Sequence, residues 1–166
     1  MKTFHQLLEG IYDPNIFKAV FLAGGPGSGK SYVAAASGVG KSNPYGLKIV
    51  DSDPLFTKML KDAGKATTPE DIYSGEGQAI RGRAKKIVSR QQAGFIEGRL
   101  GLLIDGTGKD FNKIKKSSDA LRKIGYDTYM IFVNTSLEVA QQRNEMSARQ
   151  LENCLLYTSD AADEED

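Results

Sequence analysis

The octapeptide GGPGSGKS at residues 24–31 lies between an apolar run and a stretch of small residues that favour a helix. It satisfies the pattern GxxxxGKS at every position. Glycines permit backbone angles that turn successive N–H groups toward an anion, and the following helix adds its positive N-terminal end. The octapeptide therefore predicts a phosphate-binding loop made of Gly24, Gly25, Pro26, Gly27, Ser28, Gly29, Lys30 and Ser31.

The last two residues of this loop are expected to act on a nucleoside triphosphate. Lys30 is placed to reach the β and γ phosphates, and the Ser31 hydroxyl is placed to ligate Mg²⁺. A glycine-rich turn without function is the alternative. A chance match is rare, however, on the order of one in a hundred chains. ATP and Mg²⁺ are therefore the expected ligands.

The rest of the chain alternates apolar runs typical of buried strands with stretches typical of helices. Strands are predicted at residues 18–24, 47–51, 101–105 and 127–134. Helices are predicted at residues 31–36, 55–60, 78–97 and 111–124, and from a capping-box sequence at 135–138 through Arg143. Strands that alternate with helices predict an α/β three-layer sandwich with a mainly parallel sheet.

Composition narrows the class of protein further. No apolar run reaches 18 residues and the N-terminus does not resemble a signal peptide, so a cytoplasmic protein without membrane contact is expected. Cys154 is the one cysteine, which excludes an internal disulfide and a cysteine-based metal site.

Residues 154–166 hold five of the 21 acidic residues and no Lys or Arg. Residues 1–153 thus carry 22 basic and 16 acidic residues, a net charge of +6 that suits a polyanionic ligand.

Three carboxylates follow predicted strands: Asp51 and Asp53 after the second, and Asp105 at the end of the third. In an open α/β sheet the ligand crevice lies at the carboxyl ends of the strands, so all three should face the phosphate loop. Asp105 is expected to support Mg²⁺, the alternative being a simple Asp-Gly turn. Asp53 precedes Pro54 and is expected either to cap a helix or to contact a substrate hydroxyl.

The residues after Asp105 bear on the fate of the γ-phosphate. Gly106-Thr107-Gly108 stands where ATPase motors commonly carry a glutamate that orients water, and no NKxD-type guanine-reading motif is present. Hydrolysis and a GTPase switch are therefore disfavoured. Transfer of a phosphoryl group to an acceptor is expected instead.

Four segments together resemble the zeta-toxin-like branch of P-loop kinases, in particular small kinase-like proteins of large tailed phages. They are FLAGGPGSGKS, IVDSD, LLIDGTG and LEVAQQRNEMSARQ, within a resemblance that spans roughly residues 15–152. The resemblance implies a P-loop NTPase kinase-like fold. It also implies that Asp53, or else Asp51, orients or deprotonates the acceptor hydroxyl, and that Arg143 and Arg149 belong to a catalytic lid.

The acceptor is not identified by these motifs. The resemblance implies a small molecule such as a nucleotide, nucleoside or sugar nucleotide, and it places the substrate-binding region near Arg81, Arg83 and Arg99, which otherwise form a solvated helix face. A polynucleotide 5′-kinase is one alternative, favoured by the basic surplus. A non-catalytic ATP-binding regulatory protein is another.

The C-terminal segment CLLYTSDAADE begins at Cys154 and has a different character. It matches the translation of a sequencing-library adapter (TGT CTC TTA TAC ACA TCT), with an acidic disordered tail as the alternative. We therefore expect one domain at residues 1–153 and a non-native tail at 154–166. Such a chain would lack the last strand of the sheet and leave the fourth strand unpaired, so poor solubility or inactivity is expected.

Overall fold

The computed structural model describes residues 16–36 and 47–145. Its strands are β1 (Lys18–Ala23), β2 (Lys48–Val50), β3 (Leu102–Asp105) and β4 (Asp127–Phe132). Its helices are α1 (Lys30–Ala36), α2 (Asp53–Asp62), α3 (Pro69–Tyr73), α4 (Gly75–Glu97), α5 (Phe111–Lys123) and α6 (Leu137–Glu145). Each predicted strand and helix is present, and α3 is an addition that the sequence pattern did not indicate.

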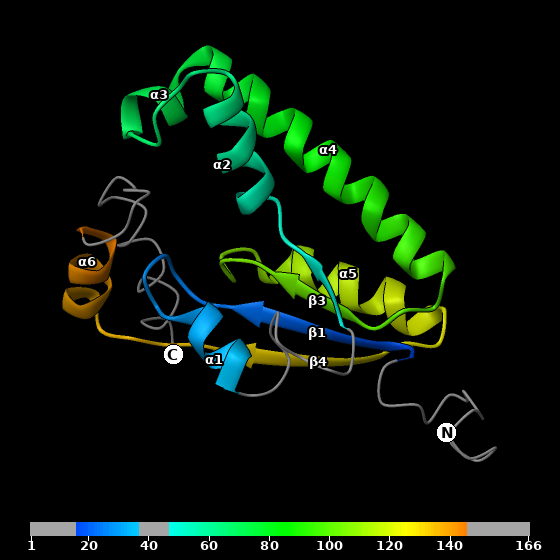
Figure 1. Ribbon diagram of the computed structural model, residues 1–166. Coiled ribbons are helices and arrows are strands. Elements are labelled where there is room, and N and C mark those ends of the chain that lie inside the picture. The colour runs from blue at the N-terminus through cyan, green and yellow to red at the C-terminus, as the bar shows by residue number, and fades with distance from the viewer. Residues whose placement is uncertain (1–15, 37–46, 146–166) are drawn as a thin grey trace, which may run out of the picture.

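The four strands form one sheet in the order β2-β3-β1-β4 (Figure 1). Every pairing is parallel, with Ala19 of β1 opposite Leu102 of β3 and Thr128 of β4. The predicted α/β sandwich is confirmed, and its sheet is wholly rather than mainly parallel. Parallel strands require crossover connections, which the helices supply.

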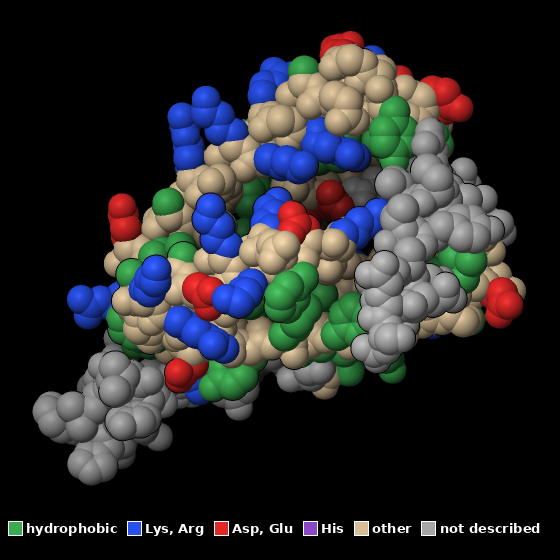
Figure 2. Space-filling model, turned by 180° about the vertical axis from the view of Figure 1, so that it is seen from behind, with side chains coloured by type: hydrophobic (Ala, Val, Ile, Leu, Met, Phe, Trp, Pro, Cys, Tyr) green, Lys and Arg blue, Asp and Glu red, His purple; other side chains and the backbone are tan. Residues whose placement is uncertain are grey.

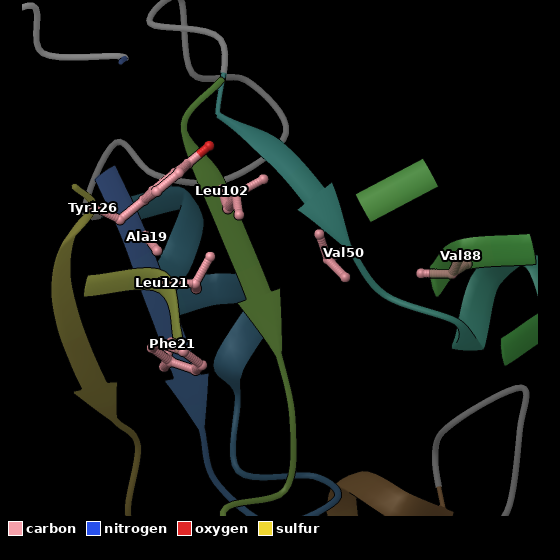
Figure 3. Packing of buried hydrophobic residues seen from close by; sticks show 7 residues of the cluster. All are labelled: Ala19, Phe21, Val50, Val88, Leu102, Leu121 and Tyr126. Atoms are coloured by element: carbon pink, nitrogen blue, oxygen red, sulfur yellow. The ribbon is translucent and has the colours of Figure 1, made fainter. Parts of the chain in front are cut away.

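Side chains of β1 alternate between two hydrophobic cores, one on each face of the sheet. Ala19 and Phe21 pack on one face with Val88 of α4 and Leu121 of α5, together with Val50, Leu102 and Tyr126 (Figure 3). Val20 and Leu22 pack on the other face with Leu103, Val133 and Ala34 of α1. Because both faces are covered, the strands read as continuous apolar runs, and the molecule has three layers.

A third core lies among α2, α3 and α4, away from the sheet (Figure 1). Its members are at most 1% exposed: Phe56, Leu60, Ile72, Ile80 and Ala84. Burying each large side chain of this kind stabilises the fold by about 1.5–3 kcal/mol. These three helices therefore form a packed unit that projects from the β2 side of the sheet.

Two details of the helices differ from the sequence-based expectation. The hydroxyl of Ser136, not that of Thr135, accepts a hydrogen bond at the start of α6, from the N–H of Val139 at 3.5 Å. Ile87 is an apolar residue within the helix predicted at 78–97, but its side chain is 40% exposed. The buried residues of this helix are Gly77, Ile80, Ala84 and Val88.

Within the described residues, β4 is an edge strand of the sheet. Tyr129, Met130 and Phe132 of this strand are each more than half exposed. The tail at 154–166 and the expected loss of a further strand lie outside the described residues. They remain predictions.

Two glycines of α4 give a test of the packing between α3 and α4. A Cβ at Gly77 would lie 2.1 Å from the carbonyl oxygen of Asp71, whereas a Cβ at Gly82 would meet nothing within 4 Å. Gly82→Ala is expected to stabilise the protein by about 0.5–1 kcal/mol, as alanine does in an open helix position. Gly77→Ala is expected to destabilise it by about 1–3 kcal/mol, because backbone must move. Urea unfolding of both variants measures the difference, and equal effects would contradict the close approach.

Candidate active site

A cleft of about 650 Å³ opens at the carboxyl ends of β1, β2 and β3. Its volume is in the range of pockets that bind small molecules. Figure 2 shows a hollow with acidic side chains inside it and Lys and Arg side chains around it. The cleft brings together Lys30 of the phosphate loop and the predicted carboxylates Asp51, Asp53 and Asp105. The expectation that these groups share one site is thus met by the geometry.

The phosphate loop joins β1 to α1 and depends on glycine for its path. Gly27 and Gly29 have φ angles of 75° and 91°, a region that other residues rarely adopt. The ammonium of Lys30 donates to the carbonyl oxygens of Gly24 at 2.8 Å and Gly25 at 3.2 Å. Ser28 is buried. The loop therefore holds its lysine in the lining of the cleft.

Helix α6 packs directly on the phosphate loop. A Cβ at Gly27 would lie 2.5 Å from the carbonyl oxygen of Ala140, so this glycine is required for the close approach as well as for its φ angle. The guanidinium of Arg143 donates to the carbonyl oxygens of Gly27 and Ser28, both at 3.3 Å. The structure thus places Arg143 at the phosphate loop, where a lid arginine is expected, while Arg149 lies outside the described residues.

Asp105, at the end of β3, has an unusual environment. Burial raises the pKa of its carboxyl from 3.8 to about 6, and the neighbouring charges of Asp51 and Asp53 add to the effect. The charge of Lys30 and a hydrogen bond from the N–H of Gly106 act in the opposite direction. Its Oδ1 atom is buried and has no hydrogen-bond partner among the described residues. Such a carboxylate has a strong electrostatic demand for a cation.

Asp51 and Asp53 make different contacts at the start of α2. The Oδ1 atom of Asp51 accepts a hydrogen bond of 2.9 Å from the N–H of Asp53 and so satisfies the first turn of α2. Ser52 stands at the N-cap position without a side-chain cap, and Asp53 is the first residue of the helix. The expectation that Asp53 caps the helix was wrong. Its carboxylate is exposed and lines the cleft.

The donors available to Mg²⁺ are few. No group of three or more His, Cys, Asp or Glu side chains that could hold a metal is found among the described residues. Ser31 is exposed in the first turn of α1, and it is absent from the described lining of the cleft that contains Asp105. Mg²⁺ commonly takes only one or two protein ligands and completes its shell with water and phosphate oxygens. The unpartnered Oδ1 atom of Asp105 suits such a ligand role, whereas Ser31 as a second ligand stays a prediction.

The helices supply cleft residues that the sequence motifs did not indicate. They are Lys85, Ser89 and Gln92 of α4, and Lys113 and Ser117 of α5. The sequence gives one sign that such residues share a helix face, namely the spacing of four residues between Lys85 and Ser89 and between Lys113 and Ser117.

The three arginines Arg81, Arg83 and Arg99 lie outside the described lining of the cleft. Arg81 stacks on the ring of Phe56, with its Cζ atom 4.7 Å from the ring centre, and Arg99 lies over Phe17 at 5.8 Å. Arg83 is exposed on α4. None of these three arginines is among the described residues that line the cleft. Two of the three have aromatic neighbours that the local sequence does not show. A role of these arginines in a substrate-binding region stays a prediction.

No helix in the described part of the chain is both long and apolar enough to cross a bilayer.

Known structures share the fold of this chain but differ strongly from it in sequence. The chain matches a structure of the PezAT toxin–antitoxin system of Streptococcus pneumoniae with a TM-score of 0.58 and 18% identity, over 86% of this chain and 57% of that one. It matches the Pnkp1/Rnl/Hen1 RNA repair complex with a TM-score of 0.62 and 18% identity, over 87% and 43%. It matches the AvrRxo1-ORF1:AvrRxo1-ORF2 complex with a TM-score of 0.63 and 14% identity, over 86% of this chain and 46% of that one.

The chain thus spans about half the length of these three structures, which share its fold. No curated protein sequence matches the chain. A family model described as zeta toxin matches residues 14–154. With most of its length matched by that model, and with a P-loop kinase-like fold, the chain belongs to the zeta toxin family.

Proposed function

We propose that this chain is an ATP- and Mg²⁺-dependent phosphotransferase that moves the γ-phosphate of ATP to a hydroxyl group of a small acceptor. The acceptor is a nucleotide, a nucleoside or a sugar nucleotide. One observation carries the proposal: a single cleft contains the phosphate-loop lysine and three carboxylates from the ends of two neighbouring strands. Lys30 provides positive charge for the phosphates, and the carboxylates provide a base and a cation ligand.

In the proposed reaction the acceptor oxygen attacks the γ-phosphorus. A new O–P bond forms while the bond between the γ-phosphorus and the β,γ-bridging oxygen breaks, and ADP leaves. Asp53 takes the proton of the hydroxyl, because its carboxylate is exposed to the cleft whereas Asp51 already accepts a bond from the backbone. Arg143 is proposed to secure the phosphate loop through its two carbonyl contacts, and Arg149 to complete the lid.

Mg²⁺, when bound, would neutralise charge on the phosphate oxygens. Ser31 and Asp105 would hold it, as the buried and unpartnered Oδ1 atom of Asp105 supports. Apart from the metal, the loop itself contributes backbone N–H groups and the N-terminal end of α1 to phosphate binding.

A polynucleotide 5′-kinase is the second candidate. The observation that favours it is the ring of Lys and Arg side chains around the hollow in Figure 2, together with the charge of +6 on residues 1–153. Binding of a single-stranded oligonucleotide that weakens steeply with salt would favour this candidate over a small acceptor. Nucleotide binding without transfer to either class would instead indicate a regulatory ATP-binding protein.

Lys30→Ala tests the nucleotide site. Removal of the ammonium is expected to weaken Mg-ATP binding by roughly 10- to 100-fold, the loss of a charge-assisted contact worth about 1.5–3 kcal/mol. Titration calorimetry measures the affinity. Lys123→Ala, an exposed lysine at the end of α5, is the matched control and should bind as the wild type does. Unchanged affinity in Lys30→Ala would remove this residue from the site.

Asp53→Asn tests the proposed base. We expect this variant to bind ATP normally but to transfer phosphate about 10²- to 10⁴-fold more slowly, since a general base is lost. The assay offers γ-labelled ATP to a metabolite extract and identifies the labelled species. Asp62→Asn, at the other end of α2, is the control. Normal transfer by Asp53→Asn would assign the role to another group.

Asp105→Asn tests the electrostatics of the cleft without any ligand. Since the pKa of Asp105 is raised to about 6, the folded protein binds this proton more tightly than the unfolded chain does. Stability from this group is therefore present near pH 4 and is lost as pH rises through about 6. The variant is expected to be more stable than the wild type by about 1–2 kcal/mol at neutral pH, with the partly exposed carboxyl discounted for screening. The advantage should vanish near pH 4.

Urea unfolding at several pH values measures this difference. Asp62→Asn, which removes an exposed carboxylate outside the described lining of the cleft, provides the baseline. A pH-independent difference between the wild type and Asp105→Asn would show that burial does not raise this pKa.

A further inference from the structure

Helices α4 and α5 carry a basic surface on the side that faces away from the sheet. Both helices pack on the same face of the sheet, with Val88 and Leu121 in one core cluster. The outer basic surface consists of five exposed cations: Arg83, Lys86 and Arg90 of α4, and Lys116 and Lys123 of α5. None of them is among the described residues that line the cleft. In Figure 2, Lys and Arg side chains lie on both sides of the hollow.

On α4 the direction of the cations follows from their spacing to buried residues. Ala84 and Val88 are buried, and Lys86 and Arg90 each follow one of them by two positions. Two positions correspond to about 200° around an α-helix, which is the side opposite the buried residues. Arg83 comes seven positions before Arg90 and so shares its side. Along the helix axis the three cations are about 4.5 and 6 Å apart.

The same relation holds on α5. Ile114 packs against the core cluster and Leu121 belongs to it, and Lys116 and Lys123 each follow one of them by two positions. The two lysines are seven positions apart and lie on one side of the helix. Two elements that are distant in the sequence therefore direct cations to the same side of the molecule.

The outer basic surface is poor in carboxylates. Residues 77–96 of α4 contain no Asp or Glu. The one carboxylate of α5, Asp119, pairs with Lys115 of its own helix at 3.0 Å. In the part of the chain that the structure describes, the ion pairs involve none of the five cations. Their charge is thus directed to the solvent, where it attracts anions.

Two features of α4 lower its stability without a gain in packing. Lys86 is three positions after Arg83 and four before Arg90, and like charges at these spacings repel each other. Gly82 is four positions before Lys86, and Gly94 is four positions after Arg90. A Cβ at either glycine would meet nothing within 4 Å, so packing does not require them. Clustered cations beside positions without side chains would let a bulky anion approach the helix closely.

The side chains among the cations indicate which kind of anion fits. Residues 83–90 and 116–123 contain no aromatic residue on which the bases of a single strand could stack. Ile87 is the one exposed large apolar side chain in these two segments. Protein interfaces and membrane-bound helices need several apolar anchors. The phosphates of a double helix, whose bases are hidden, need only cations.

We infer that the outer basic surface binds the phosphate backbone of a double-stranded nucleic acid without reading its sequence. This binding lies outside the cleft and does not depend on the proposed phosphotransfer. It also differs from the action of a polynucleotide 5′-kinase, in which the end of a strand must enter the cleft.

The first experiment measures fluorescence anisotropy of a labelled DNA duplex of about two helical turns over a series of salt concentrations. Five neutralised phosphates predict a slope of about −4.5 for the logarithm of the binding constant against that of the salt concentration. The triple variant Arg83→Gln/Lys86→Gln/Arg90→Gln should bind at least about 10-fold more weakly, with a slope of about −2.

The matched control is Lys48→Gln/Lys58→Gln/Lys61→Gln, which removes three exposed lysines of β2 and α2. It changes the net charge by the same amount and should keep the slope of the wild type. Equal losses in both triple variants would show that binding follows net charge alone, and would overturn the surface. So would a wild type that does not bind the duplex.

Two further variants separate loss of charge from loss of structure. Arg83→Lys/Arg90→Lys keeps both charges and should bind within about 3-fold of the wild type, because phosphate accepts from lysine as from arginine. Lys116→Gln/Lys123→Gln leaves α4 intact and should reduce the slope by about 2. Urea unfolding should find the triple variant of α4 at least as stable as the wild type. A charge-preserving variant that fails to bind would contradict the inference.

The second experiment compares the open duplex with one closed at both ends by hairpin loops. Equal affinity is expected, because the surface contacts the backbone and not an end. A requirement for a free end, or binding to phosphatidylserine vesicles but not to the duplex, would overturn the inference. Mg-ATP binding is measured on the same samples, so that failure of the proposed function would appear there while duplex binding persists.

Discussion

β1 is the strand on which the remainder of the molecule depends, because β3 and β4 both form their ladders with it. Its side chains supply both cores of the sheet, and its carboxyl end leads directly into the phosphate loop. Parallel pairing then forces the ends of β3 and β2 to the same edge. The carboxylates of Asp105, Asp51 and Asp53 meet Lys30 in one cleft as a result of strand direction alone, whatever the loops between them contain.

The same arrangement places negative side chains of the cleft at the strand ends and positive side chains on the helices. The strand ends bring carboxylates close together, and burial of Asp105 makes its negative charge unfavourable without a cation. The helices bring lysines from the side. A site of this kind is less stable by itself than a neutral one would be, which is a common property of binding sites. The stability comes instead from the cores of the sheet and from the third core among α2, α3 and α4.

Much of this fold could be predicted from the sequence, for reasons that differ between its parts. Buried parallel strands read as apolar runs, and the phosphate loop is a contiguous motif whose geometry depends on its own glycines. The residues PEDIY of α3 are too few to show a helical period. The local sequence allows a cap at Asp53, because it shows an Asp-Pro pair but not that Asp51 is the residue that accepts the N–H of Asp53.

The walls of the cleft could not be predicted, since they are products of tertiary packing. Arg81 and Lys85 are one turn apart on α4, yet Arg81 stacks on the ring of Phe56 whereas Lys85 lines the cleft. Nothing in the local sequence distinguishes these two cations. Their separation depends on the rotation of α4, which the core around Val88 sets.

The contact between Arg143 and Gly27 joins residues that are 116 positions apart. β1 also pairs with strands far along the chain, as Ala19 does with Leu102 and Thr128. Contacts of such long sequence separation form late, because the loop between them must close first. During synthesis the glycine-rich loop therefore leaves the ribosome long before α6, the helix that contacts it through Arg143 and Ala140. For the proposed function, nucleotide binding would then depend on contacts that form late in folding.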